Sequence, residues 1–271
     1  MRLLVTGANG FLGRALQPLL PPAWDVAALL RVPAASGGYP RGYASIGQLL
    51  AGEQGFDAVL HLAAQIAVPA AGPTGYLAAN VGLPSTLVQA YPDARHVLAS
   101  SVSVFGGIDA LPVTMRTPCS PEHPYGRSKL AGEHVVAMAP SHAIVRFSSL
   151  LGRGMQANTF VPRIIADARS HRRITLLGTG ERLQNYLDVR DAAAMCLRAL
   201  EATGNFATLG IGARAWSNRE VAAMVASRLG AGVVSAGSDP TRSCDYALTG
   251  SVDLGENMRP LEVTLDWLVE Q

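Results

Sequence analysis

Lysine is almost absent from this chain of 271 residues: Lys129 is the only one, and every other member of its 22 basic residues is arginine. The two side chains are not equivalent, because arginine is a planar fork that stays charged whereas lysine is a compact charge whose pKa moves when it is buried. A single amine kept among so many guanidinium groups predicts a task at residue 129 that arginine does not perform.

Charge of either sign is scarce as well. Asp, Glu, Lys and Arg make up 15% of the residues, below the ~25% of an average globular protein. Apolar residues make up 49%, which predicts a large buried core. The formal net charge is only +2, so the chain has no long-range field that would attract polyanions. We therefore expect no nucleic-acid partner and no anionic membrane partner.

Cysteine is equally rare, with only Cys119, Cys196 and Cys244. They show no CxxC or Cys/His spacing, which predicts neither a metal site nor a disulfide framework. The opening MRLLVTGANG is a strand without the apolar core of a signal peptide. Residues 58–92 carry no formal charge, but prolines interrupt them, which argues against a membrane span. We expect a cytoplasmic protein without a metal.

Apolar runs alternate with helical periodicity in the first half of the chain. Strands are expected at 2–7, 25–31, 57–64, 96–101 and 142–148, with helices after the first strand and at 75–91 and 125–139. Strands that are apolar throughout and separated by helices predict a parallel sheet covered on both faces.

Beyond about residue 150, expected strands and helices no longer alternate regularly. We therefore expect an α/β fold with a Rossmann-type, doubly wound parallel sheet over residues 1–150 that binds a dinucleotide. Residues 151–271 are expected to form mostly a small α/β substrate-binding subdomain, with 173–201 returning to the Rossmann sheet.

Three glycines stand between the first strand and the following helix, at Gly7, Gly10 and Gly13 in TGANGFLG. The first permits a tight turn, the second lets backbone approach a pyrophosphate, and the third allows the helix to pack closely on the sheet. The anion then lies at the positive end of the helix. Because a strand precedes the glycines and a helix follows, the segment predicts a dinucleotide-binding turn rather than a plain connection.

The end of the second strand indicates which dinucleotide is bound. An acidic residue there binds the ribose 2′-hydroxyl of NAD, whereas a cation accommodates the 2′-phosphate of NADP. In DVAALLR the expected acidic place holds Leu30, and Arg31 follows. The sequence therefore favours NADP over NAD, unless Arg31 is simply a solvated loop residue.

Tyr125 and Lys129 lie four residues apart in PYGRSK. On a helix these positions share one face, so both side chains can point at one site. A cation within about 4 to 6 Å of a phenol lowers its pKa from ~10, which lets the tyrosine exchange a proton with an alcohol or carbonyl near neutral pH. The alternative is an i,i+4 surface pair without a chemical role.

These features together resemble the extended short-chain dehydrogenase/reductase family, which includes NAD-dependent epimerases and dehydratases of nucleotide sugars. The segments that carry the resemblance are TGANGFLG at 6–13, HLAAQ at 61–65, NVGLPSTL from Asn80, ASSVSVFGG at 99–107, PYGRSKLAGE at 124–133, VRFSSLLGRG at 145–154, NYLDVRDAA at 185–193 and RPLEVTLDWL at 259–268. They cover nearly the whole chain and specify the family more closely than the substrate.

The resemblance implies a role for each matching residue. The family's catalytic serine corresponds to Ser101, with Ser100 and Ser103 as rivals. Tyr125 is the proton donor or acceptor, and Lys129 tunes it and holds the nicotinamide ribose.

The implied cofactor-binding residues are Gly7, Asn9, Gly10, Phe11, Leu12, Gly13, Arg31, Leu62, Ala63, Ala64, Asn80, Ser100, Tyr125 and Lys129. The implied substrate-binding residues are Gln65, Ser101, Ser103, Ser149, Asn158 and Arg182. His61 is expected to be a packed residue rather than an acid.

Several residues depart from the family pattern. Val102 follows Ser101 where family dehydratases carry an acidic pair, which disfavours dehydration, and no cysteine follows as in the epimerase-reductases, which disfavours double epimerisation. Ser149 stands in place of a common asparagine. Gln184 stands in place of an arginine that often meets the diphosphate, with Arg182 two places away.

The leading hypothesis is an NAD(P)-dependent oxidoreductase or epimerase that acts on a secondary alcohol or ketone. The resemblance makes a nucleotide-sugar 4-ketoreductase or 4-epimerase its most specific form. A reductase of a small non-nucleotide carbonyl and a non-catalytic NADP-binding sensor are the alternatives. The resemblance also implies a homodimer that pairs through the helices at 75–91 and 125–139.

Overall fold

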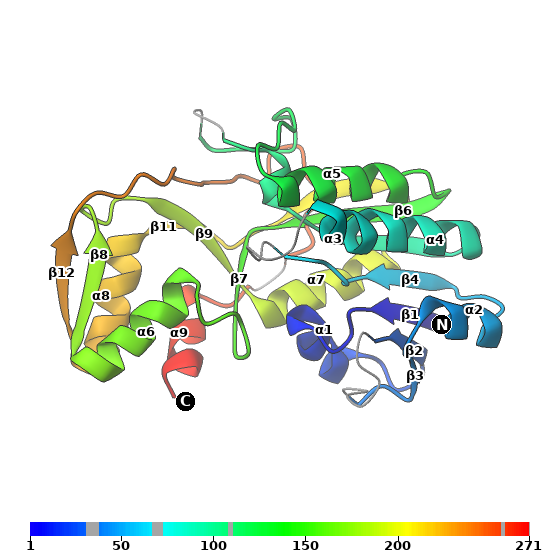
Figure 1. Cartoon of the computed structure of the whole chain (residues 1–271), viewed down its shortest axis with the longest axis horizontal. Coiled ribbons are helices and arrows are strands. Elements are labelled where there is room, and N and C mark those ends of the chain that lie inside the picture. Colours follow the sequence, from blue (N-terminus) through cyan, green and yellow to red (C-terminus); the bar gives the residue numbers. More distant parts are fainter. Residues whose placement is uncertain (31–37, 67–72, 108–110, 256–257, 271) are drawn as a thin grey trace.

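The larger lobe of the chain is built on one parallel sheet (Figure 1). The structure, a computed structural model, describes residues 1–30, 38–66, 73–107, 111–255 and 258–270. Within these residues seven strands pair in the order β10-β6-β5-β4-β1-β2-β3, all parallel. The strands are β1 (Arg2–Thr6), β2 (Asp25–Leu29), β3 (Arg41–Tyr43), β4 (Ala58–His61), β5 (Arg95–Ser101), β6 (Ser141–Phe147) and β10 (Phe206–Gly210).

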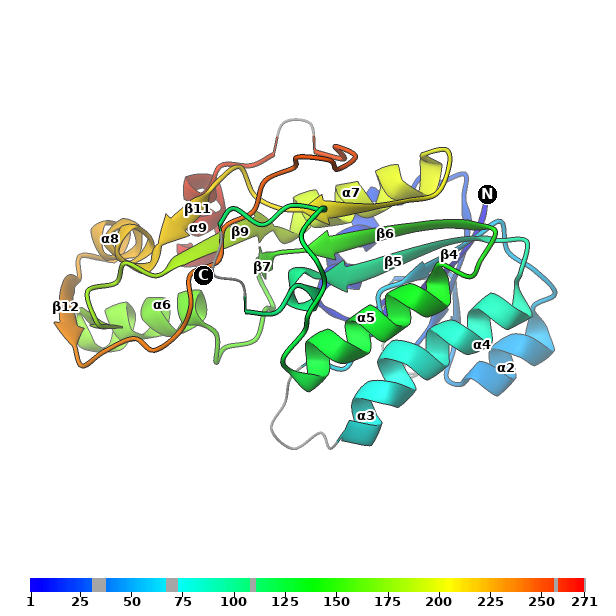
Figure 2. The ribbon, with the colours of Figure 1, turned by 90° about the horizontal axis from the view of Figure 1, so that it is seen from above.

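Helices cover both faces of this sheet, because its strands are apolar on both sides. One face carries α1 (Phe11–Leu16) and α7 (Val189–Glu201), which share a buried cluster with β1, β4 and β6. The other face carries α2 (Ile46–Gly52), α4 (Leu83–Ala90) and α5 (Pro124–Val136). Figure 2 shows α7 on one side of the strands and α3 (Pro73–Leu77), α4 and α5 on the other. The predicted doubly wound α/β fold is confirmed.

Three short helical turns complete the larger lobe. A 3-10 turn, η1 (Gln17–Leu19), follows α1, and a π-helical turn, η2 (Ala78–Gly82), joins α3 to α4. A second 3-10 turn, η3 (Val102–Val104), begins where β5 ends. Ser101 starts that turn, since its Oγ accepts a hydrogen bond from the Ser103 amide at 3.2 Å.

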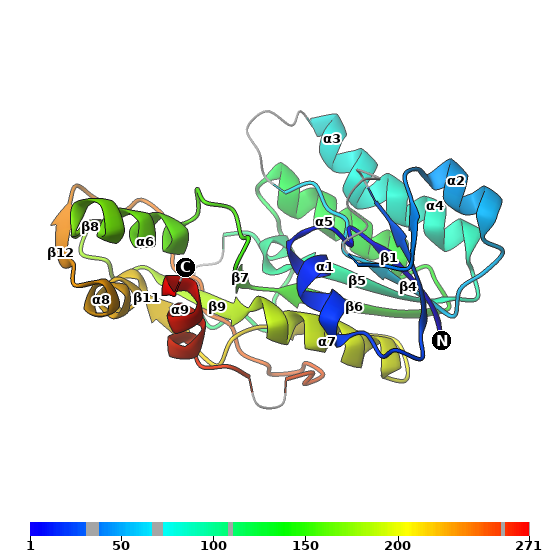
Figure 3. The same cartoon turned by 90° about the horizontal axis from the view of Figure 1, so that it is seen from below.

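The smaller lobe has its own sheets and its own core. One sheet has the order β11-β9-β7 and the other pairs β12 with β8. Its elements are β7 (Ser149–Leu151), α6 (Phe160–His171), β8 (Arg173–Leu177), β9 (Leu183–Asp188), β11 (Ala215–Ser217), α8 (Asn218–Leu229), β12 (Gly232–Ala236) and α9 (Leu261–Val269). Figure 3 shows α6, α8 and α9 gathered at the end of the molecule that lies away from the N-terminus.

The return of the chain to the larger sheet differs from the expectation. We expected residues 173–201 to return, but β8 pairs with β12 and β9 pairs with β7 and β11. Within 173–201 only α7 (Val189–Glu201) packs on the larger lobe, and the strand that joins the sheet is β10, beside β6. The physical reason is visible in β8, whose residues alternate between buried and exposed positions as in a strand with one face in solvent.

The described residues include no helix that is both long and apolar enough to cross a lipid bilayer.

Candidate active site

A cleft of about 750 Å³ opens where the parallel strands of the larger sheet end. Gly7 follows β1, Leu30 follows β2, Leu62 follows β4, and Ser101 and Ser148 mark the ends of β5 and β6. Strand order changes direction at β1, with β2 on one side and β4 on the other. In open α/β sheets such a switch point at the carboxyl edge is where ligands bind.

The turn from β1 to α1 forms one wall of this cleft. Gly7 has a φ of +67°, and a Cβ built there would lie 2.6 Å from the amide nitrogen of Ala63. A Cβ on Gly13 would lie 2.4 Å from the carbonyl oxygen of Ala8. Both positions therefore require glycine, the first for its left-handed backbone and close approach and the second for tight packing. Gly13 does not line the cleft, whereas Gly7, Asn9, Gly10, Phe11 and Leu12 do.

The segment after β4 forms the floor beside that turn. Ala63 donates its backbone N–H to Thr6 Oγ1 at 3.1 Å, which fixes the segment to β1. Leu62, Ala63, Ala64 and Gln65 line the cleft.

Asn80, a predicted cofactor residue, lies behind the 62–66 segment and does not line the cleft. Its side chain is 2% exposed and accepts a hydrogen bond from the Gln65 amide at 2.8 Å. Its Nδ2 donates to the carbonyl oxygen of Gln65 at 3.1 Å and to Ser128 Oγ at 2.8 Å. Asn80 therefore links the 62–66 segment, which lines the cleft, to α5 by hydrogen bonds.

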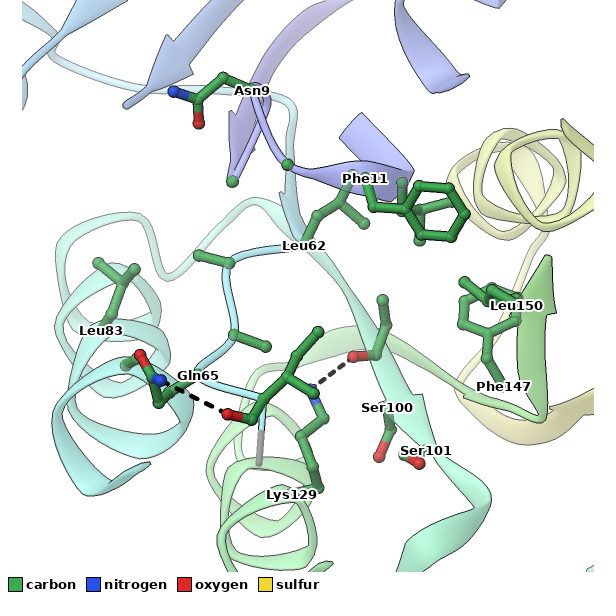
Figure 4. Close-up of a pocket in the computed structure, with 18 of the residues that line it drawn as sticks. Asn9, Phe11, Leu62, Gln65, Leu83, Ser100, Ser101, Lys129, Phe147 and Leu150 are labelled. Atoms are coloured by element: carbon green, nitrogen blue, oxygen red, sulfur yellow. Dashed lines mark hydrogen bonds between the residues drawn. The ribbon is translucent and has the colours of Figure 1, made fainter. Parts of the chain in front are cut away.

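Lys129 reaches the cleft from α5 (Figure 4). Its side chain is 3% exposed, and Nζ donates to the carbonyl oxygen of Ala99 on β5 at 2.6 Å. Burial lowers the Lys129 pKa to about 8, and the Glu133 charge opposes that change only in part. An amine with this pKa gains and loses a proton near neutral pH, which a guanidinium does not do.

Tyr125 lines the cleft on the same helix. The expectation that Lys129 lowers its pKa is not met. Burial raises the Tyr125 pKa, a hydrogen bond with Ser101 opposes the rise, and the Tyr76 charge adds to it. Desolvation of the phenolate exceeds the opposing interaction, and the ammonium of Lys129 is bonded to Ala99 instead.

The three candidate serines differ in what their hydroxyls contact. Ser100 Oγ donates to Glu133 Oε1 at 2.5 Å, and that carboxylate is also bound by Arg146 at 2.7 Å. Ser103 does not line the cleft, and its Oγ accepts from Ser101 Oγ at 3.1 Å. Ser101 lines the cleft and interacts with the Tyr125 phenol. The geometry therefore favours Ser101 as the hydroxyl available to a ligand beside Tyr125.

Four predicted substrate residues do not line the cleft, namely Ser103, Ser149, Asn158 and Arg182. Ser149 Oγ accepts from Gln184 Nε2 at 2.5 Å, and Gln184 Oε1 accepts from Arg182 Nη2 at 2.9 Å. Arg182 also donates to the carbonyl oxygen of Arg242 at 3.0 Å. These hydrogen bonds hold the Arg182 guanidinium within the smaller lobe. Asn158 is exposed and lies outside the cleft.

The wall nearest the smaller lobe was not predicted from the sequence. Its residues are Phe147, Ser148, Leu150, Met155, Gln156 and Thr159. Phe147 and Ser148 follow from the rule that parallel strands end at one edge, since they lie at the end of β6 and directly after it, whereas Leu150 lies in β7. Met155, Gln156 and Thr159 lie in the irregular stretch before α6, and no periodicity or motif marks them.

The formal charges around the cleft are few. Of the described residues that line it, Lys129 is the only cation and none is Asp or Glu. Arg31, the residue that favoured NADP, lies outside the described residues, and Leu30, Ala44, Ser45 and Ile46 line the cleft near the end of β2.

Comparison with known proteins gives a consistent set of relatives. The family described as "NAD dependent epimerase/dehydratase family" matches residues 3–212. A UDP-glucose 4-epimerase of Streptomyces lividans is 30% identical over 188 residues, which are 63% of this chain and 57% of that protein. The matched part of the chain thus spans less than two thirds of that curated relative's length.

Two solved structures of MoeE5 extend the likeness to the whole chain. The complex with UDP-glucuronic acid and NAD has a TM-score of 0.82 at 26% identity, over 100% of this chain and 98% of that one. The complex with UDP-glucose and NAD has a TM-score of 0.80 at 27% identity, with the same coverage.

Proposed function

The chain belongs to the NAD dependent epimerase/dehydratase family, and on that premise we propose that it transfers hydride between a nicotinamide dinucleotide and a secondary alcohol or ketone. The observation that carries this proposal is that one cleft is lined both by the glycine turn Gly7–Leu12 and by Ser101, Tyr125 and Lys129. The first group suits a pyrophosphate, and the second suits proton exchange at an oxygen atom.

The glycine turn fits a dinucleotide. A Cβ on Gly7 would fill the narrow space between the turn and Ala63, 2.6 Å from that residue's amide nitrogen. The turn and residues 62–64 would hold the cofactor, with Lys129 beside its ribose. The bound nicotinamide supplies hydride transfer, and the protein supplies binding, orientation and proton exchange.

Ser101 and Tyr125 act on the oxygen of the reacting carbon. Ser101 orients that oxygen with a hydrogen bond, and Tyr125 gives it a proton when a ketone is reduced. Because burial keeps the Tyr125 pKa above its usual value, the phenol stays protonated at neutral pH and is ready to donate. Lys129, with a pKa of about 8, restores the proton to the phenol after the transfer.

The substrate we propose is a nucleotide sugar that reacts at its C4 carbon, in a 4-epimerase or a 4-ketoreductase. MoeE5 was solved with UDP-glucose and with UDP-glucuronic acid, and this chain aligns with it from end to end. A thermal-shift panel of UDP, GDP, dTDP and CDP sugars with the dinucleotide present tests this proposal, because a ligand of the folded state raises the melting temperature. Shifts with none of them would contradict it.

A reductase of a small carbonyl compound is the second candidate. It is favoured by the cleft itself, where Lys129 is the only cation among the described lining residues. A diphosphate usually binds to arginine or to helix N-termini, and Arg182 is held by Gln184 and by the Arg242 carbonyl instead. NADPH oxidation with small ketones, together with no thermal shift from any nucleotide sugar, would favour this candidate.

We also propose that NADP binds at least as well as NAD. A carboxylate beside the adenine ribose rejects the 2′-phosphate, and no Asp or Glu is found among the described residues that line the cleft. Titration with both dinucleotides by intrinsic fluorescence tests this. Tighter binding of NAD than of NADP would contradict it.

Two copies of the chain are proposed to pair through α3–α4 and α5. A shallow pocket of about 360 Å³ lies between α3 and α5, and Leu77 beside it is 56% exposed. Covering such a side chain on a partner helix is favourable. Light scattering on the purified chain should give twice the monomer mass, and Leu77→Glu should lower it.

A further inference from the structure

Two buried residues of α5, one helical turn apart, are bound to two consecutive residues of β5. Lys129 Nζ donates to the carbonyl oxygen of Ala99 at 2.6 Å (Figure 4). Glu133 Oε1 accepts a hydrogen bond from Ser100 Oγ at 2.5 Å. Lys129 and Glu133 are each 3% exposed, and their i,i+4 spacing places both side chains on one face of the helix. These two bonds therefore fix how α5 lies against the strand that ends at Ser101.

The Glu133 carboxylate is also paired with a buried guanidinium. Arg146 on β6 is 8% exposed and donates from Nη2 to Glu133 Oε2 at 2.7 Å and from Nε to Glu133 Oε1 at 3.0 Å. Its guanidinium carbon lies 4.9 Å from the centre of the Phe105 ring. A buried carboxylate without a cation would strongly destabilise the fold. Arg146 therefore holds this carboxylate in its charged form, at a fixed place between α5, β5 and β6.

The titratable groups that neighbour the amine and the carboxylate are uncharged at neutral pH. Burial lowers the pKa of His61 on β4 well below its usual value, and the charge of Lys129 lowers it further. Burial raises the pKa of the Tyr125 phenol on α5 and of the Cys119 thiol before that helix. The negative charge that acts on Lys129 is thus the carboxylate of Glu133.

This carboxylate opposes the effect of burial on the amine. Burial lowers the Lys129 pKa to about 8, and the charge of Glu133 raises it in part. A nearby opposite charge favours the ionised form of a group. If the carboxylate were neutral, a larger share of the amine would lack its proton near pH 7.

We propose that Glu133 is a positioning residue for Lys129: anchored to Ser100 and held by Arg146, its carboxylate keeps the amine protonated and in place beside Tyr125. The inference rests on the proposed function, because it explains how the amine that restores the proton to Tyr125 keeps a proton of its own. A glutamine at residue 133 could accept the Ser100 hydrogen bond, but it would supply no charge.

The single lysine makes this proposal testable without a substrate. Protein grown with lysine labelled at its ε-carbon gives one side-chain signal, and its shift against pH reports the Lys129 pKa. We expect Glu133→Gln to lower that pKa by about one unit or more, because the opposite charge is lost. General loosening of the fold would have the reverse effect, since water reaching the amine would raise the pKa towards its usual 10.5.

Glu53→Gln is the matched control. Glu53 is also a buried carboxylate, with 5% exposure, and it is paired with Arg2 at 2.8 Å and bonded to Tyr43 at 2.7 Å. It follows α2 rather than lying on α5. Its substitution should destabilise the fold and leave the Lys129 pKa unchanged, whereas an equal fall of that pKa in both variants would contradict a specific role for Glu133.

A second variant covers the case in which Glu133→Gln does not fold. Ser100→Ala keeps the charge of Glu133 and its pair with Arg146 and removes only the bond to β5. The amine should then be held less closely against the strand and be better solvated, so its pKa should rise.

The two variants should therefore shift the Lys129 pKa in opposite directions. An unchanged or higher pKa in Glu133→Gln, or an unchanged or lower pKa in Ser100→Ala, would overturn the proposal. Because the amine is titrated without any turnover, these results are distinguishable from a failure to find hydride transfer, which would contradict the proposed function instead.

Discussion

The two walls of the cleft are built in opposite ways. The wall from the larger lobe carries the glycine turn, the Ser101 and Tyr125 hydroxyls and the Lys129 amine, all at strand ends or on one face of α5. The wall from the end of β6 and the smaller lobe carries the apolar residues Phe147, Leu150 and Met155 and the uncharged polar residues Ser148, Gln156 and Thr159. Ser149, Gln184 and Arg182 of the smaller lobe do not line the cleft and are bonded to one another.

Under the proposed function, the wall of the larger lobe would exchange a proton with the oxygen atom of the substrate. The opposite wall would select the substrate, and its described lining residues carry no formal charge. Substitutions in the two walls should therefore affect different steps.

The largest effect is expected for Tyr125→Phe. Loss of the proton donor should lower kcat by about 10²- to 10⁴-fold, while dinucleotide affinity stays nearly unchanged. Tyr186→Phe is the matched control, because the Tyr186 hydroxyl is buried in the smaller lobe without a hydrogen-bond partner among the described residues. Steady-state turnover and dinucleotide titration of both variants measure this, and full activity of Tyr125→Phe would show that Tyr125 is not the proton donor.

The second largest effect is expected in the pH dependence of the free energy of unfolding, because Lys129 is buried. Its folded pKa of about 8 lies below the usual 10.5, so between these values the unfolded chain binds more protons and stability rises with pH. Below pH 8 the buried ammonium destabilises the folded chain fully. The free energy of unfolding then rises by about 3 kcal/mol towards pH 10.5, because the amine loses its charge. Denaturant titrations should show this rise in the unsubstituted protein and its loss in Lys129→Met.

Arg127→Met on the exposed side of α5 is the control for this pH dependence. It removes a cation from the same helix without relieving a buried charge, so its stability should follow that of the unsubstituted protein. Equal slopes in the Lys129→Met and Arg127→Met variants would show that the amine is solvated.

A smaller effect is expected for Gly7→Ala. The positive φ costs about 1 to 2 kcal/mol, and the new Cβ would meet the Ala63 backbone at 2.6 Å. The turn must shift, so dinucleotide affinity should fall at least tenfold. Gly204→Ala is the control, because Gly204 also has a positive φ of 75° but no atom within 4 Å of its Cβ position. The Gly204→Ala variant should have a lower free energy of unfolding and an unchanged affinity for the dinucleotide.

The smallest effect is expected at Gln184 in β9, which does not itself line the cleft. Gln184→Arg introduces a cation at the position where the family resemblance implies one, and a charge-assisted hydrogen bond to phosphate contributes about 1 to 3 kcal/mol. We expect roughly tenfold tighter UDP binding by calorimetry, with no change for Gln184→Met. Unchanged affinity in Gln184→Arg would mean that residue 184 does not reach a diphosphate.

The contrast between the two walls of the cleft also explains which features could be predicted from the sequence. The fold, the glycine turn and the placement of Tyr125 and Lys129 follow from strand–helix alternation and from i,i+4 spacing. The lowering of the Tyr125 pKa by Lys129 did not follow, because burial and the bond to Ala99 depend on tertiary packing. Asn80, which the resemblance assigns to the cofactor, is buried beside the cleft, and the hydrogen bonds that join its amide to the 62–66 segment also depend on tertiary packing.

The smaller lobe was less predictable for a physical reason. Its cleft residues Met155, Gln156 and Thr159 lie in irregular backbone, where no period links one side chain to the next. The pairing of β8 with β12 joins segments that are far apart in the chain, and short strands carry little information about their partners.

One structure would test the central claim directly: the chain crystallised with a nicotinamide dinucleotide. The account predicts the pyrophosphate against the Gly7–Gly10 turn and the nicotinamide ring beside Tyr125 and Lys129, with Ser101 facing the same space. A dinucleotide bound with its nicotinamide ring away from Tyr125, or no dinucleotide bound in this cleft, would contradict it.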